Sequence, residues 1–506
     1  MKKILFCSAA FLALGVLASG SAKADRDILS KGNAQLWDLR IENKKAPGPF
    51  SKALAHYTMG IIYDNEGALE DAMVEYKTAI SFDPKVSRLH SRLGVDYFLS
   101  EKIDKAVEEF KLAKSLDPAD TKPHFLLALA YTALNSFDLA QKEYEEVVHL
   151  NPNDIAALGS LADLLVVEEK MAEALLVYEK LVEKEKNSSL LYFNSGVIYS
   201  RLGKLGQAID AFNKAVNIEP NYLEAHIGLG VLYEMKNDLP NSIASFEKAL
   251  KIDPLNIRAY YALGQLYYKA KRFNEAVHQY ELLIKLNPKD PDAYIQWAGL
   301  YIKEKNFNAA TVVLSNAYLE GIKDVDLYLA LGYVYGEESK NDKALKFYTA
   351  ALEMAPDDAR IHFHLGVQYD KMKERFLAVK EFREAIRLDP KFSDAYNYLG
   401  YMFAEEGSNL DEAIVLVRKA LEIEPENGAF LDSLGWAYFQ KGDTSEAFVE
   451  LKKAIKFEPN DPTIRDHLGD IYFKKGLRDK ARGEWEKSLK IDPKQDKVRE
   501  KLKKRR

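Results

Sequence analysis

Five of the nine histidines recur at a fixed interval, and imidazoles in a cluster can hold a metal ion or move a proton. Neighbours in this set are separated by 34 residues or by multiples of 34: they are His56, His90, His124, His226 and His362. Such an interval places each ring at one position of a repeated helix, where a histidine packed between helices is the simpler interpretation. His362 and His364 stand two residues apart, so a helix turns their rings to different sides. We therefore predict no metal site.

Motifs that mark common catalytic and nucleotide-binding sites are absent from the sequence. It contains no G-x-x-x-x-G-K-[ST], G-x-G-x-x-G, G-x-S-x-G or H-E-x-x-H. Carboxylates are numerous, but they are scattered over outward positions, as Glu108 and Glu109 are, where solvation is the usual state. We predict that the protein is not an enzyme and uses no cofactor, so its function depends on the surface that its helices build.

The elements that build this surface are predicted by a repeat of 34 residues. Prolines close most of the units, at 84, 118, 152, 220, 254, 288, 356, 390, 425, 459 and 493. The proline is missing at Lys186 and Ile322, and one step is 35 residues long because of an insertion at 407–409; we expect these places to change the curvature. The predicted units are 53–86, 87–120, 121–154, 155–188, 189–222, 223–256, 257–290, 291–324, 325–358, 359–392, 393–427, 428–461 and 462–495.

Two helices are predicted in each unit. Counted from the first residue of a unit, apolar residues at positions 4, 7 and 11 share one helical face, and those at 20, 24 and 27 share another. Position 8 is Gly or Ala in every unit, which lets the two helix axes approach closely, while large rings at 11 and 24 fill the space beside them. Proline at position 32 ends the second helix. A pair this short needs the next pair to cover its apolar face, which predicts a solenoid.

This pattern resembles the tetratricopeptide repeat. In the second unit the residues that carry the resemblance are His90, Leu93, Gly94, Tyr97, Ala106, Phe110, Ala113 and Pro118. The resemblance implies an all-α fold, a right-handed superhelical solenoid of thirteen units over residues 53–495. It also implies a concave groove that is lined by the first helix of each unit and binds proteins or peptides.

The family exposes side chains to ligand at positions 2, 5, 6, 9, 12 and 13. In the early units these positions hold small or aliphatic residues, whereas the last three units combine rings with polar groups, as peptide-binding surfaces do. The predicted partner-binding residues are Asn397, Tyr398, Tyr401, Asp432, Trp436, Phe439, Asp466, His467, Asp470 and Phe473. The alternative is that some of these rings pack against the neighbouring turn of the superhelix.

The first residues have the pattern of an export signal. Two lysines at residues 2 and 3 precede an apolar run over 4–18, and residues 22–24 read Ala-Lys-Ala. We predict a signal peptide over residues 1–24, cleavage after Ala24, and a periplasmic or secreted protein; an uncleaved anchor is the alternative. Residues 25–52 have apolar residues at helical spacing and are predicted to form an N-terminal capping helix and linker.

The cysteine content and the net charge exclude some kinds of site and partner. Cys7 is the only cysteine, which excludes a disulfide framework and a thiolate zinc site. The net charge is −6 although the C-terminal tail, residues 496–506, is basic. The body of the chain is therefore acidic and repels nucleic acid. Val498 and Leu502 could begin a capping helix, while the last four residues stay solvated. Two further kinds of contact are compatible with the sequence: weak contact of the basic tail with anionic lipid, and self-association of the chain.

Residues 397–402 and 431–436 are similar to the C-terminal block of Gram-negative envelope repeat proteins. Some of those proteins are adaptors that bring substrates to a carboxyl-terminal processing protease. The resemblance implies a non-catalytic adaptor of the cell envelope that holds partner proteins in its groove. The alternative is a self-assembling structural scaffold for an envelope complex that serves secretion, polysaccharide export or the cell wall.

Overall fold

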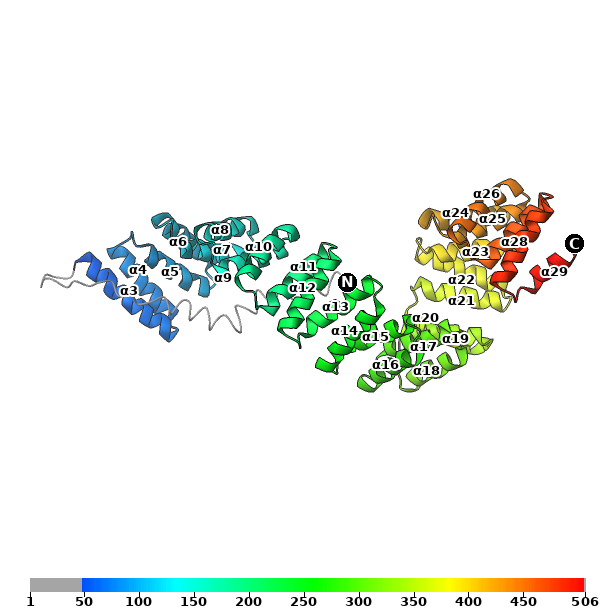
Figure 1. The fold of residues 1–506 in the computed structure, drawn as a ribbon, viewed down its shortest axis with the longest axis horizontal. Helices are drawn as coiled ribbons and strands as arrows, with labels where there is room; N and C mark the ends of the chain where they lie inside the picture. The colour runs from blue at the N-terminus through cyan, green and yellow to red at the C-terminus, as the bar shows by residue number, and fades with distance from the viewer. Residues whose placement is uncertain (1–47, 505–506) are drawn as a thin grey trace. The chain divides into compact units, whose positions relative to one another are not determined.

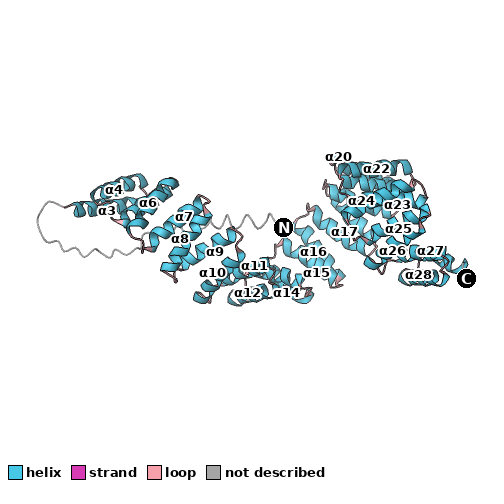
Figure 2. Ribbon diagram, turned by 90° about the horizontal axis from the view of Figure 1, so that it is seen from above, coloured by secondary structure: helices cyan, strands magenta, loops and turns pink. Residues whose placement is uncertain are grey.

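A computed structural model describes residues 48–504 of the chain. The predicted signal peptide and all but the last residues of the predicted segment 25–52 lie outside this range. The described residues form 27 helices. Figure 2 shows helices and loops in this part of the chain and no strand. None of these helices combines the length and the apolar character that a membrane span requires. The prediction of an all-α solenoid is confirmed.

The chain divides into two compact units, Met1–Ala259 and Tyr260–Arg506, and each is described by itself. The helices of the first unit are α3 (Pro49–Glu66), α4 (Leu69–Phe82), α5 (Ser87–Leu99), α6 (Ile103–Leu116), α7 (Thr121–Ala133), α8 (Phe137–Leu150), α9 (Ile155–Val167), α10 (Met171–Lys184), α11 (Ser189–Arg201), α12 (Leu205–Ile218), α13 (Leu223–Met235) and α14 (Leu239–Ile252).

The boundary between the units falls within α15 (Ile257–Lys269). The second unit continues with α16 (Phe273–Leu286), α17 (Pro291–Lys303), α18 (Phe307–Leu319), α19 (Val325–Glu337), α20 (Asn341–Met354), α21 (Ala359–Lys371), α22 (Arg375–Leu388), α23 (Ser393–Glu406), α24 (Leu410–Ile423), α25 (Gly428–Lys441), α26 (Thr444–Phe457), α27 (Pro462–Lys474), α28 (Arg478–Ile491) and α29 (Asp496–Lys504). Within each unit, successive helix pairs lie side by side (Figure 1).

The close approach of the two helices in a pair depends on a small residue opposite a ring. A Cβ atom added to Gly94 of α5 would lie 2.5 Å from the Phe110 ring of α6, and one added to Gly332 would lie 2.4 Å from Tyr348. These positions are 8 and 24 of the repeat. Real Cβ atoms do not approach so closely, so the missing side chain is what admits the ring. The predicted role of position 8 is confirmed.

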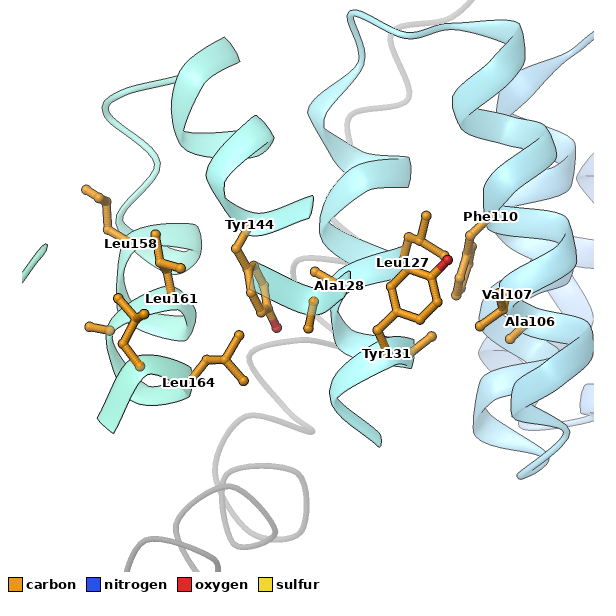
Figure 3. Close-up of a cluster of buried hydrophobic side chains, with 14 of the residues drawn as sticks. Ala106, Val107, Phe110, Leu127, Ala128, Tyr131, Tyr144, Leu158, Leu161 and Leu164 are labelled. Atoms are coloured by element: carbon orange, nitrogen blue, oxygen red, sulfur yellow. The ribbon is translucent and has the colours of Figure 1, made fainter. Parts of the chain in front are cut away.

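In the repeat 121–154 position 8 is alanine, and its small side chain is buried beside the ring at position 24. Ala128 of α7 is fully buried, and Tyr144 of α8 points towards it, as Figure 3 shows. In the same view Tyr131, at position 11, lies beside Val107 and Ala106 of the preceding pair. These side chains belong to one continuous core cluster of the first unit. Rings at 11 and 24 therefore join neighbouring pairs as well as the helices within a pair.

The turn between the helices of each pair uses a left-handed residue at position 15. Glycine supplies it at Gly67 (φ 76°) and Gly203 (φ 71°), while other residues adopt it elsewhere, as Glu101 (φ 59°) does. The first helix of a repeat is often capped by the last residue of the repeat before it. At the start of α9, for example, the Asp154 carboxylate accepts a hydrogen bond from the backbone N–H of Ala157. The left-handed residue and the helix cap are local features, so they direct the chain independently of the packing between helices.

The repeats that lack the closing proline, and the repeat with the insertion at 407–409, end their helices in other ways. Without the proline, α10 still ends at Lys184, whereas α18 is one residue shorter and is followed by Gly321 in the left-handed region (φ 79°). At the insertion, α23 gains a residue and Gly407 (φ 65°) caps it. The first described helix begins at a proline: Pro49 is the first residue of α3, where the missing N–H carries no penalty.

The position-4 histidines are structural, as predicted. The His90 ring lies between the Pro84 carbonyl oxygen (3.0 Å from Nε2) and the Glu109 carboxylate (2.7 Å from Nδ1). His124 and His362 make the same pair of contacts in their repeats. Each ring thus ties the end of one repeat to both helices of the next. A matching glutamate 19 residues after the histidine was the sequence signal for this arrangement.

The contact between positions 8 and 24 can be tested by substitution. Gly94→Val is expected to lower the free energy of unfolding by about 2 kcal/mol, because the added carbon atoms overlap the Phe110 ring. Gly159→Val is the matched control, since a Cβ on Gly159 meets nothing within 4 Å. Denaturant unfolding followed by circular dichroism measures both. Equal stability of the two variants would contradict the role given to the small residue.

Candidate protein-binding surface

Aromatic rings at position 5 pack against the ring at position 24 of the same repeat. The centroid of the Phe363 ring lies 5.8 Å from that of Phe382, which stands at position 24. The same pairing of position 5 with position 24 joins Tyr57 to Tyr76, Phe125 to Tyr144, Phe193 to Phe212, and Tyr261 to Tyr280. A ring at this position therefore extends the core towards the predicted groove.

Position 6 contacts the ring at position 24 of the preceding repeat. Tyr398 of α23 packs on Phe382 with ring centroids 4.9 Å apart, and its hydroxyl donates a hydrogen bond to Asp370 Oδ2 (3.2 Å). Burial and the charge of Asp370 raise the pKa of Tyr398. Asn194 holds position 6 of the repeat 189–222 and makes the corresponding contact: its Nδ2 donates a hydrogen bond to the hydroxyl of Tyr178 in the preceding repeat (3.2 Å). Tyr398 thus lies between two repeats.

Rings at positions 9 and 12 of the last three repeats are half-exposed. Trp436 of α25 stacks on Phe439 of the same helix, with ring centroids 5.2 Å apart. Tyr401 of α23 and Phe473 of α27 hold equivalent positions in the neighbouring repeats and are also half-exposed. We call Tyr401, Trp436, Phe439 and Phe473 the aromatic row.

A buried ion pair lies beneath the aromatic row. His467 Nδ1 lies 2.9 and 3.0 Å from the two carboxylate oxygens of Asp432, and both side chains are buried. Burial alone would lower the pKa of His467, but the charge of Asp432 outweighs it and raises that pKa above its ordinary value. The imidazole also stacks on Trp436, with ring centroids 4.1 Å apart. Asp432 and His467 therefore position Trp436, and a partner would not contact them directly.

Lys501 of α29 neutralises the remaining two predicted aspartates. Its Nζ lies 2.7 and 2.8 Å from the oxygens of Asp466 and 2.6 Å from Asp470 Oδ2. Burial raises the pKa of Asp470, and the lysine opposes that shift. Val498 is buried against the preceding repeat, so α29 is a packed helix and Lys501 is held in place. Lys501 was not among the residues predicted from the sequence.

Two polar atoms beside the aromatic row are buried and lack a hydrogen-bond partner among the described residues. They are Asn397 Oδ1, an acceptor, and Trp436 Nε1, a donor. The main chain of an extended peptide offers both a donor and an acceptor, so modest side-chain movement would let it satisfy this pair. No group of three or more side chains that could hold a metal ion is found in residues 48–504.

The comparison with protein families agrees with the geometry. Models described as TPR repeat or tetratricopeptide repeat match more than half of the chain, over residues 53–86, 125–189, 196–237, 235–271, 257–290, 325–358, 359–392, 377–428 and 435–476. The chain belongs to the tetratricopeptide repeat family. No curated protein matches its sequence.

Several solved structures are similar to this chain at low sequence identity. Naa15/Naa10 bound to HypK has 16% identity and a TM-score of 0.45, over 87% of this chain and 68% of that chain. Yeast Tom70 has 18% identity and a TM-score of 0.40, over 90% and 94%. YrrB, a TPR protein with an unusual peptide-binding site, has 21% identity and a TM-score of 0.33, over 37% and 96%.

Sequence reasoning also missed a charge cluster at one end of this tetratricopeptide repeat surface. Arg375, at the start of α22, forms ion pairs with Asp370 of α21 and Glu406 of α23. Asp370 in turn accepts the hydrogen bond from Tyr398, so the cluster links three helices of two successive repeats. Its members lie 5 to 36 residues apart in sequence, and no single motif joins them.

The role of Lys501 is testable in the whole chain. Lys501→Met is expected to destabilise α27 to α29 by about 1 to 2 kcal/mol, because two half-buried carboxylates lose their counter-ion. Lys503→Met, on an exposed side chain of the same helix, is the control and is expected to have no effect. Hydrogen exchange of peptides from α27 and α29 measures the change. Unchanged protection in Lys501→Met would show that the cluster has no structural role.

Proposed function

We propose that this tetratricopeptide repeat protein is a non-catalytic adaptor of the bacterial cell envelope, and that it binds partner proteins along the first helices of its repeats. The observation that carries the binding proposal is the aromatic row. It presents half-exposed rings on α23, α25 and α27 in three successive repeats. Aromatic anchors surrounded by a few polar groups supply most of the binding energy at protein interfaces.

The chemistry beside the row favours an extended peptide segment. Trp436 Nε1 and Asn397 Oδ1 need an acceptor and a donor, and a peptide main chain in extended form supplies both. Glu405, Asp466 and Asp470 make the surroundings acidic, although Lys501 offsets part of that charge. Apolar or aromatic side chains of the partner would pack on the rings, and its main chain would fix the register.

The envelope location and the identity of the partner rest on the sequence. The pattern of residues 1–24 supports export, and the similarity of residues 397–402 and 431–436 to envelope repeat proteins supports the presentation of clients to an envelope protease. Cell fractionation with N-terminal sequencing tests the location. A mature chain that begins at Asp25 in the envelope fraction is the expected result, and an intact Met1 in the cytoplasmic fraction would overturn it.

The binding surface is tested by capture from crosslinked envelope extract. The double variant Tyr401→Ala with Trp436→Ala is expected to reduce the captured partner about tenfold or more, because it removes two anchors. Tyr398→Phe is expected to have a small effect, since its ring packs between repeats and only its hydroxyl is lost. Circular dichroism confirms that each variant is folded.

A matched control removes a ring from another face. Phe376, at the start of the second helix α22, is 82% exposed, so Phe376→Ala should leave capture unchanged. Equal capture by the native protein and the double variant would discard the aromatic row as the site. Light scattering of the same samples distinguishes the alternative scaffold: self-association that is identical in all variants, with no captured partner, would favour that function.

A further inference from the structure

Asp96 occupies a position that other repeats fill with apolar side chains. Position 10 faces the core, and Asp96 of α5 is 1% exposed there. The residues at this position in the other units, apart from Gln368, are Ile62, Ala130, Leu164, Ile198, Leu232, Leu266, Leu300, Val334, Met402, Ala437 and Ile471. A buried carboxyl group is costly unless its oxygens are paired or it carries a proton.

The second polar residue at position 10 shows what a paired group looks like. Gln368 of α21 is also buried, and its Nε2 donates a hydrogen bond to Asn341 Oδ1 (2.9 Å) in the preceding repeat. Asp96 Oδ2, in contrast, is buried without a hydrogen-bond partner among the described residues, and the same is true of Asp64 Oδ1 in α3. Asp96 and Asp64 thus each keep one oxygen that accepts nothing.

The groups around these two carboxyls come from three helices. From α4, the Tyr76 hydroxyl donates a hydrogen bond to Asp64 Oδ2 (2.5 Å). From α5 itself, Arg92 Nη1 lies 3.8 Å from the same oxygen. Lys122 of α7 lies near Arg92, and burial and that charge lower its pKa. Arg92 therefore lies close to Asp64 and belongs to the same helix as Asp96.

A shared proton stabilises two buried carboxyl groups of this kind. Two carboxylates that are close together in a buried place do not both ionise at neutral pH. Burial first, and then the charge of Asp64 and a hydrogen bond with it, raise the pKa of Asp96 to about 8. A protonated Asp96 is a hydrogen-bond donor, and Asp64 is the acceptor that faces it.

We propose that Asp64 and Asp96 share one proton and form a pH-sensitive latch between the first repeat, α3 and α4, and the second, which begins with α5. When the proton is released to solvent, two negative charges remain in a buried place and repel each other. The contact between the repeats then weakens. Because Asp64 and Arg92 stand at positions 12 and 6, the change also reaches the ligand-facing side of the first two repeats.

The direction of the pH effect follows from the two states. In the open state Asp96 has the ordinary carboxyl pKa of about 4, whereas the closed state holds the proton up to about pH 8. Opening therefore releases a proton between these values, and each pH unit raises the opening constant about tenfold. Stability that is present at low pH is lost as the pH rises, and the loss levels off above about pH 8.

Hydrogen exchange of the full chain between pH 6 and pH 9 tests the latch. After correction for the intrinsic exchange rate, protection of α3, α4 and α5 in the native protein is expected to fall about tenfold per pH unit up to pH 8. Asp96→Asn keeps an uncharged donor, so its protection should not change with pH. Asp163→Asn is the control: within the repeat 155–188 the Asp163 carboxylate accepts a hydrogen bond from the Tyr178 hydroxyl (2.9 Å), and its loss should leave the response of α3 to α5 intact.

A slope in Asp96→Asn equal to that of the native protein would overturn the proposal, as would a native protein without any slope. If Asp96→Asn does not fold, Asp96→Leu provides the second test, since most other repeats carry an apolar residue at this position and the variant removes the group that holds the proton, so it should also show no slope. Infrared spectroscopy separates the proton from a merely structural effect. The C=O stretch of a protonated carboxyl is expected at pH 7 in the native protein, and absent at pH 10 and in Asp96→Asn; its absence at pH 7 would refute the shared proton.

Discussion

The contact between a small residue at position 8 and a large side chain at position 24 determines the rest of this structure. In ten of the thirteen repeats the partner at position 24 is an aromatic ring, and in the eight of these that have glycine at position 8 the ring lies where a Cβ atom would otherwise stand. The same ring reaches the next repeat: Phe212 packs against Gly196 in its own pair and would meet a Cβ on Gly228 in the following one. One side chain therefore sets the spacing within a pair and between pairs, so an apolar face that is incomplete in one repeat is covered by its neighbour.

This constraint decides which ligand-facing positions are available. Position 5 extends the core by packing on the ring of its own repeat, and position 6 touches the ring of the preceding one, as Tyr398 does on Phe382. Positions 9 and 12 lie one and two turns further along the first helix, beyond that ring, and their side chains stay half-exposed. Tyr401 and Trp436 are therefore placed to bind a partner because the packing of positions 5, 6 and 24 does not need them.

Spacing alone was enough to predict the fold and part of the candidate surface. The 34-residue interval and the pattern of small and large residues predict helix pairs, because both reflect contacts that recur in every repeat. Pairs that occur once were not predicted. Lys501 binds Asp466 from 35 residues away, and His467 pairs with Asp432 over the same interval. Such partners are recognisable only when each position is compared with its counterpart one repeat earlier, and the sequence alone does not show whether the two side chains turn towards each other.

The ring contact is common to most repeats and therefore does not distinguish one interface from another. The polar pairs that occur only once give individual interfaces different stabilities. Gln368 donates a hydrogen bond to Asn341 across the interface, whereas Asp96 keeps one buried oxygen without a hydrogen-bond partner among residues 48–504 and, in our proposal, shares a proton with Asp64. The Asp432 and His467 pair also responds to pH, because the raised pKa of His467 makes its stabilisation strongest at low pH and lost as the pH rises through that value. Both pairs weaken in the same direction, although one is a carboxyl pair near the start of the array and the other an ion pair near its end. A repeat protein built on one shared apolar contact thus acquires local differences in stability through a few buried charges, and in a solenoid those differences stay local because each repeat contacts only its neighbours.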